Sequence, residues 1–190
     1  GGLGIVLTGA SLPLMLEILG TSAWSMGWIL IGITSLLFLP LGLWAALQLK
    51  TPIQSETKII PLPLRQMLPE FAGYAGFGLG YIVYLTFLSA WMTENLASAS
   101  FITFIWGILC SSICISPFIW GPILTRYASG MPLALILTCI ATGSALPVLV
   151  NNTFTLLLSA LVFGLSVFMA PGAVTNFTRK NLPPESWARA

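Results

Sequence analysis

The feature that most constrains this chain is the absence of charge from long parts of it. No Asp, Glu, Lys or Arg occurs in residues 18–49, 71–93, 95–125 or 127–178. A helix needs about 20 apolar residues to cross a bilayer, and each of these stretches can supply them. Charged residues make up 6% of the chain, whereas soluble domains contain about 25%. The sequence therefore predicts an all-α polytopic membrane protein.

Turn-forming residues divide these stretches into separate spans. Residues 147–152 interrupt the longest stretch, and residues 20–22 and 95–98 supply shorter turns. Within the fourth span, Pro117 and Pro122 are expected to bend or end the helix. Six transmembrane helices are predicted, at residues 1–18, 23–49, 68–95, 100–123, 131–150 and 153–174.

The main polar stretch, residues 50–67, is predicted to be a linker because its three prolines disfavour a regular helix. It separates residues 1–49, with two helices, from residues 68–190, with four. If the linker is cytoplasmic, all seven Lys and Arg residues fall on the cytoplasmic side, in agreement with the positive-inside bias. The linker and both chain ends are therefore predicted to be cytoplasmic. Because Gly1 already belongs to an apolar run, we expect an internal piece of a longer protein.

The span at residues 68–95 combines a glycine-rich half with an aromatic and polar half. Small residues on one helical face let a neighbouring helix approach closely, and the face here consists of Gly73, Gly76 and Gly80. The second half carries Tyr81, Tyr84 and Thr86. One interpretation is a helix equipped for contacts near the middle of the membrane. The other is a packing helix with interfacial aromatic side chains.

The residue types that are missing exclude several kinds of chemistry. The chain has no His and no Asp, which removes the commonest metal ligand and general base. We therefore expect no metal site, no cofactor and no enzyme activity. A membrane enzyme using Glu17, Glu94 or Asn95 is one alternative, and a non-catalytic membrane scaffold is another. The net charge of +2 does not favour nucleic acid as a partner. No Glu lies at mid-span, so we expect any proton relay to lie outside this chain.

A short motif follows the fourth span. Gly121, Arg126 and Gly130 match the glycine and arginine positions of a loop signature that joins paired helices on the cytoplasmic side of major facilitator superfamily transporters. The match is degenerate, because Thr125 stands where that family often has Asp and the second basic position is absent. In this loop the chain resembles the superfamily, and the resemblance implies a loop that takes part in conformational change.

The order of the spans strengthens this resemblance. Two spans, a linker and four spans resemble the fifth to tenth helices of a twelve-helix transporter. The glycine-rich residues 1–13 are similar to the fifth helix of antiporter-type members. Residues 73–91 and 159–171 resemble the seventh and tenth helices of the YbfB/YjiJ-type branch. The resemblance implies a partial major-facilitator-type helical bundle in the inner (cell) membrane of a bacterium.

The resemblance also implies a mechanism, namely secondary active transport of a small molecule by alternating access, with efflux by antiport as one form of it. The seventh and tenth helices of the family line the central cavity. Carried onto this chain, the implied substrate-binding residues are Tyr81, Tyr84, Thr86, Ser166, Phe168 and Met169. Such side chains suit an apolar or aromatic substrate, and filling gaps between helices is the alternative role for each. The implied partners are the lipid bilayer, this substrate and coupled protons; substrate identity, direction and coupling ion stay open.

Overall fold

The computed structural model describes residues 15–48, 63–95 and 97–183, and all regular elements in this part of the chain are helical. Residues 15–19 form a short helical segment. The labelled elements are the 3-10 helix η1 (Thr21–Ala23) and the α-helices α2 (Trp24–Gln48), α3 (Leu64–Glu94), α4 (Ala99–Arg126), α5 (Met131–Leu149), α6 (Thr153–Val167) and α7 (Ala170–Asn181).

Five helical stretches among the described residues are long and apolar enough to cross a membrane. They are Trp24–Gln48, Met67–Glu94, Ala99–Arg126, Met131–Leu149 and Thr153–Asn181. The last one combines α6 and α7. Most of the predicted first span, residues 1–18, lies outside the described residues, so the count of six stays a prediction. The predicted turns at residues 95–98 and 147–152 are confirmed in outline, because helices end and begin there.

Two predicted boundaries differ from the structure. Helix α3 begins at Leu64, inside the predicted linker, with Pro63 at its N-cap. Proline is tolerated there because the first N–H groups of a helix have no partner within the helix. Helix α4 continues through Pro117 and Pro122 to Arg126, beyond the predicted end at Ile123. In an apolar setting, helix is the form that satisfies most backbone groups, so these prolines do not end it.

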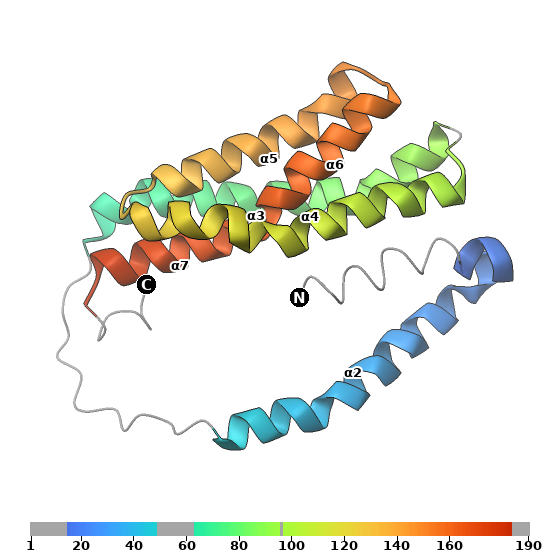
Figure 1. Ribbon diagram of the computed structural model, residues 1–190, viewed down its shortest axis with the longest axis horizontal. Helices are drawn as coiled ribbons and strands as arrows, with labels where there is room; N and C mark the ends of the chain where they lie inside the picture. The colour runs from blue at the N-terminus through green and yellow to red at the C-terminus, as the bar shows by residue number, and fades with distance from the viewer. Residues whose placement is uncertain (1–14, 49–62, 96, 184–190) are drawn as a thin grey trace.

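Helices α3 to α7 form one bundle with α6 packed against both α4 and α5 (Figure 1). Two glycines allow this close approach. A Cβ at Gly164 would lie 2.5 Å from the Leu109 carbonyl oxygen of α4, and one at Gly143 of α5 would lie 2.9 Å from the Phe163 backbone nitrogen. Backbones this close gain van der Waals contact, which drives helix association in lipid.

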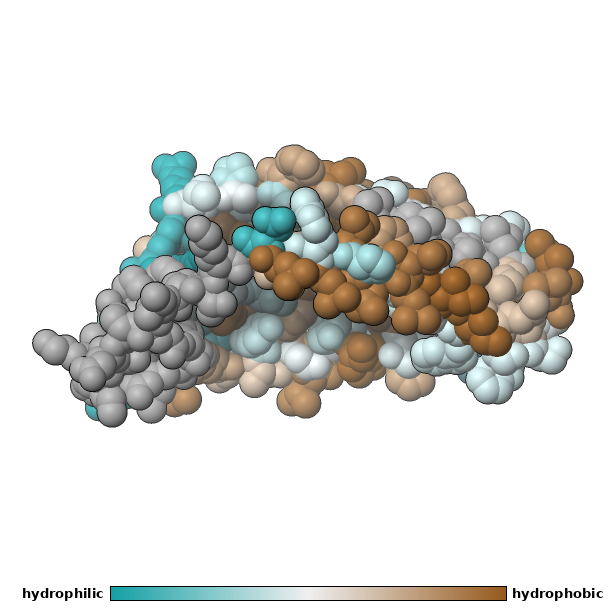
Figure 2. Space-filling model, turned by 90° about the horizontal axis from the view of Figure 1, so that it is seen from below, coloured by the Kyte–Doolittle hydropathy of each residue, from teal (hydrophilic) through white to brown (hydrophobic). Residues whose placement is uncertain are grey.

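Helix α2 lies apart from this bundle in Figure 1. Gly27 is its only buried residue, and its large apolar side chains are exposed, up to 86% for Leu47. Figure 2 shows the apolar surface that extends along this side of the molecule, with hydrophilic residues gathered toward the left end of the view. A helix that is apolar on all sides is suited to lipid or to other apolar helices.

Candidate functional site

Tyr84 of α3 lies where three helices of the bundle meet. Its hydroxyl is 2.7 Å from Ser159 Oγ of α6, and Ser159 Oγ donates to the Gly143 carbonyl of α5 at 2.6 Å. A serine hydroxyl has one hydrogen, so Tyr84 donates to Ser159. The ring of Tyr84 also stacks on Phe163, with 3.9 Å between the ring centroids. Tyr84 therefore links α3 to α5 and α6, and sequence reasoning missed its partner Ser159.

The other two site residues predicted on α3 have different surroundings. Tyr81 is half-buried and stacks on Phe77 of its own helix, with 4.6 Å between centroids. Thr86 is exposed. Tyr81 thus extends an aromatic row along α3, whereas Thr86 faces away from the described part of the bundle.

The three site residues predicted on the last span lie at a break in it. Ser166 is buried in the last turn of α6, and Phe168 and Met169 separate α6 from α7. Pro171 has no N–H, and its ring would clash with the carbonyl of Val167 one turn earlier. The Met169 N–H instead donates to the Ser166 carbonyl at 3.0 Å. The last span is therefore interrupted between α6 and α7, and Ser166, Phe168 and Met169 lie together at this interruption.

Trp120 of α4 supplies a hydrogen bond to a carbonyl group near this break. The Met169 N–H, which would bind the Leu165 carbonyl in a regular α-helix, binds Ser166 instead. Trp120 Nε1 donates to the freed Leu165 carbonyl at 2.8 Å, and the Trp120 side chain is only 7% exposed. Sequence reasoning missed this role, because a tryptophan near a span end is typical of a membrane interface. The signal that could have found it is Pro171 within an otherwise continuous apolar span.

The glycine face predicted on α3 is only partly covered. A Cβ at Gly73 would lie 3.3 Å from Leu137 Cδ1 of α5, so this position faces a neighbouring helix. Added Cβ atoms at Gly76 or Gly80 would meet nothing within 4 Å. Among the described residues no helix makes close contact with these two positions, and their role in helix packing stays a prediction.

The loop motif extends from the last turns of α4, which hold Gly121 and Arg126, to the start of α5 at Gly130. Gly121 is half-buried, and Arg126 is exposed with its guanidinium 5.9 Å from the ring centroid of Tyr127. Gly130 is the N-cap of α5. Contact with Glu70 distinguishes Gly130 from the other two motif residues: a Cβ there would lie 2.5 Å from Glu70 Oε2 of α3.

Side chains of α7 hold the same turn from the other side. Lys180 Nζ donates to the carbonyls of Leu124, Thr125 and Tyr127, at 2.9, 2.6 and 3.0 Å. Two amides add to this: Asn176 donates to the Leu124 carbonyl at 2.7 Å and Asn181 to the Ala128 carbonyl at 2.7 Å. A cation at a helix C-terminus satisfies carbonyls that lack intrahelical partners and complements the helix dipole.

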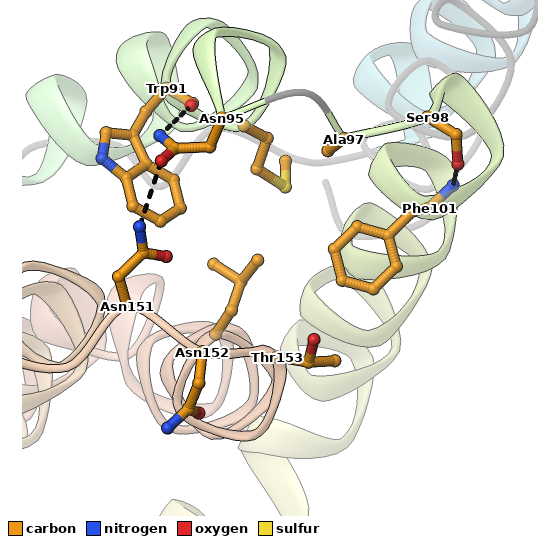
Figure 3. Close-up of a pocket in the computed structure, with 10 residues that line it drawn as sticks. Trp91, Asn95, Ala97, Ser98, Phe101, Asn151, Asn152 and Thr153 are labelled. Carbon is orange, nitrogen blue, oxygen red and sulfur yellow. Dashed lines mark hydrogen bonds between the residues drawn. The ribbon is translucent and has the colours of Figure 1, made fainter.

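A polar cavity lies at the opposite end of the bundle (Figure 3). Asn151 Nδ2 donates to Asn95 Oδ1 at 3.0 Å and joins the α5–α6 turn to the α3–α4 turn. Phe101 of α4 and Thr153 of α6 lie around the same cavity, whose volume is about 580 Å³. No group of three or more His, Cys, Asp or Glu side chains that could hold a metal occurs in the described part of the chain.

Long apolar helices that pack through glycines, with an interrupted span inside the bundle, define a polytopic integral membrane protein. A family model described as "Uncharacterised MFS-type transporter YbfB" matches residues 1–190. The chain therefore belongs to this family of major facilitator superfamily transporters, which are not enzymes. The predicted family and the all-α membrane fold are confirmed. Comparison with curated proteins and with solved structures finds no match.

Proposed function

We propose that this chain is part of a secondary active transporter that moves a small molecule by alternating access, with efflux by antiport as one form of it. The observation that carries the proposal is the break at Phe168 and Met169 inside the bundle. Irregular backbone within a membrane is tolerated where protein covers it or where it lines a cavity. Transporters form their substrate sites at such interrupted helices.

The substrate face that we propose includes α3 beside Tyr84. A cavity of about 250 Å³ opens there, lined by Gly80, Tyr84 and Phe87 of α3 and by Pro147 of α5. At the break, Phe168 is 37% exposed and offers a separate aromatic surface. An apolar lining with few polar groups suits an apolar or aromatic molecule that carries one or two hydrogen-bonding groups.

The arrangement in the full transporter follows the family. Residues 1–49 supply the fifth and sixth helices, residues 50–67 the linker, and residues 68–190 the seventh to tenth helices. The linker, the Arg126 turn and both ends of the chain face the cytoplasm, because this placement puts all seven Lys and Arg residues on one side. The substrate face then lies between the two halves, which alternate in access.

Substitution of Tyr84 tests this proposal in the full-length parent protein. Tyr84→Ala removes both the hydroxyl and the ring that lines the cavity, so we expect lower efflux of a fluorescent aromatic cation such as ethidium from cells. Tyr84→Phe keeps the stacking on Phe163 and removes only the donor to Ser159. It should therefore lose less efflux than Tyr84→Ala.

The matched control is Leu79→Ala, at an exposed position on the same helix. It should keep efflux at the parent level, with equal amounts of all variants in the membrane by immunoblot. Parent-level efflux by Tyr84→Ala across a panel of aromatic and aliphatic compounds that the parent exports would remove this face from the substrate site.

A further inference from the structure

The polar cavity at the end of the bundle opposite the Lys180 contacts has a shape that suits a small molecule (Figure 3). Its volume of about 580 Å³ lies within the range of small-molecule sites, about 300–1,000 Å³. Met92 and Leu156, which are 1% and 5% exposed, give it a buried apolar lining. Trp91 of α3 and Phe101 of α4 lie on opposite sides of the open space. An aromatic ligand can therefore stack on either ring.

Side-chain amides add hydrogen-bonding groups that the fold uses only in part. Asn95 Nδ2 donates to the Trp91 carbonyl at 2.8 Å, and Asn95 Oδ1 accepts from Asn151 Nδ2 at 3.0 Å. These two bonds hold both amides in place. A carboxamide has two N–H donors and a carbonyl oxygen, so Asn151 keeps one N–H and its Oδ1 for a ligand. Figure 3 shows Asn151 Oδ1 and the Thr153 hydroxyl turned toward the open space.

Helix capping does not account for Asn151. Asn95 is the C-cap of α3, and Asn152 is the N-cap of α6 and accepts from the Thr155 N–H. Asn151 stands between two helices, and its side chain bonds to Asn95 alone within the described part of the chain. Its remaining donor and acceptor therefore face the cavity with no structural task in these helices.

The absence of charge from the lining restricts the class of ligand. No Asp, Glu, Lys or Arg is found among the described residues that line the cavity, and Glu94 at the end of α3 is exposed and outside it. A charged group placed there would lose water without meeting an opposite charge, which costs free energy. A carboxamide is uncharged and both donates and accepts, so it can pair with Asn151 as Asn95 does.

Trp91 connects this cavity to the one beside Tyr84, because it lines both. Seven residues separate Tyr84 from Trp91. This spacing corresponds to about two helical turns, or about 10 Å along α3, so both side chains lie on the same face. A molecule that stacks on Trp91 in the polar cavity thus lies next to the Tyr84 cavity without filling it.

We propose that the polar cavity is a second binding site, separate from the Tyr84 cavity, for uncharged aromatic molecules that carry a carboxamide. The ligand's ring stacks on Trp91, and its carboxamide pairs with Asn151 and the Thr153 hydroxyl. The bound molecule bridges the α3–α4 turn and the α5–α6 turn, which the Asn95–Asn151 bond already joins. Binding there does not require transport, so the inference goes beyond the proposed function.

Fluorine NMR of small probes tests the proposal with the full-length parent protein in detergent. The probe is para-fluorophenylacetamide, an uncharged aromatic carboxamide. Two analogues keep the ring and change the charge: para-fluorophenylacetate is an anion, and para-fluorophenethylamine is a cation. We expect the protein to broaden the fluorine resonance of the carboxamide. The resonances of both charged analogues should keep the width that they have with empty detergent micelles.

Three variants locate the bound probe. Asn151→Leu removes the amide and Thr153→Val removes the hydroxyl, so each should weaken binding of the carboxamide by about fivefold, as the loss of one hydrogen bond does. Thr93→Val is the matched control, because it removes a hydroxyl from an exposed position at the same end of α3 but outside the cavity. It should leave binding unchanged. If Asn151→Leu lowers the midpoint of thermal unfolding, Thr153→Val decides.

Several results would overturn the inference. They are no broadening of the carboxamide resonance by the parent, equal broadening of a charged analogue, and parent-level binding by both Asn151→Leu and Thr153→Val. Loss of binding in Tyr84→Ala alone would also overturn it, since the probe would then occupy the Tyr84 cavity. Ethidium efflux by the same parent protein tests the proposed function separately, because the probe measures binding at equilibrium.

Discussion

At the scale of single residues, one indole N–H donates a hydrogen bond to a backbone carbonyl of another helix. Trp120 supplies the hydrogen that the Leu165 carbonyl loses when the span breaks. In lipid no water replaces that partner, so the carbonyl would stay unsatisfied without the indole. The break and the tryptophan therefore depend on each other, although they belong to different helices.

Replacement of Trp120 measures how strongly the stability of the protein depends on its hydrogen bond to Leu165. Trp120→Phe keeps an aromatic ring but removes the donor to Leu165, and an unsatisfied buried carbonyl costs about 1–3 kcal/mol. We expect a lower midpoint of thermal unfolding for the full-length protein in detergent. Trp24→Phe, at a position that is 62% exposed, serves as the control and should leave the midpoint unchanged. Equal midpoints for both variants would show that Leu165 finds another donor.

Site residues were predictable where their type alone restricts their role. Tyr84 stood out because a phenol within an apolar span needs a partner. Its partner Ser159 did not stand out, since a serine in a transmembrane helix commonly bonds to its own backbone, as Ser111 does to Gly107. Lys180 was used only as a charge that sets orientation. Its contacts with α4 depend on how the chain returns to the turn, which no local pattern encodes.

At the scale of helices, close packing depends on glycines that the sequence did not single out. Gly143 and Gly164 place α5 and α4 against α6 at distances that exclude any Cβ. The glycine-rich run of α3 looks more conspicuous, yet Gly76 and Gly80 meet none of the described residues. Composition shows where glycines are frequent, whereas the helix–helix crossing decides which of them are buried.

A pair of alanine substitutions distinguishes these positions. Gly164→Ala would place a Cβ 2.5 Å from a backbone oxygen of α4, so the helices must move apart. We expect destabilisation of about 1–3 kcal/mol, which is typical of overpacking. Gly107→Ala in α4 adds a Cβ with nothing within 4 Å and should be neutral or stabilising. Thermal unfolding in one detergent measures both, and equal stability of the two would contradict the close approach.

At the scale of the whole molecule, the described chain consists of a bundle and one helix outside it. Helices α3 to α7 share a core, whereas α2 exposes its apolar side chains along its whole length. The division at the linker, expected from three prolines and a cluster of charges, stays a prediction, because most of residues 50–67 lie outside the described part of the chain. Charge-free length predicted the five spans that the described residues contain. It did not predict the interruption of the last span, because hydropathy is the same in a straight helix and in a broken one.

Cysteine labelling tests the orientation of the bundle. Ser98 and Ser129 are both exposed, and they lie at opposite ends of α4. In a cysteine-free full-length parent, we expect Ser98→Cys to react with a membrane-impermeant thiol reagent on intact cells and Ser129→Cys to react only after the cells are opened. The one-sided distribution of Lys and Arg motivates this outcome. Labelling of position 129 alone in intact cells would reverse the orientation.

The short turn between α5 and α6 has a consequence for how the protein assembles. Asn152 and Thr155 form a capping box that starts α6 immediately after α5 ends, so the two helices return along each other with little intervening chain. Pairs of helices that are adjacent in sequence lose little loop entropy when they meet. This hairpin can therefore form while later parts of the chain are still being synthesised, and α7 can dock onto the end of α4 after the hairpin has formed.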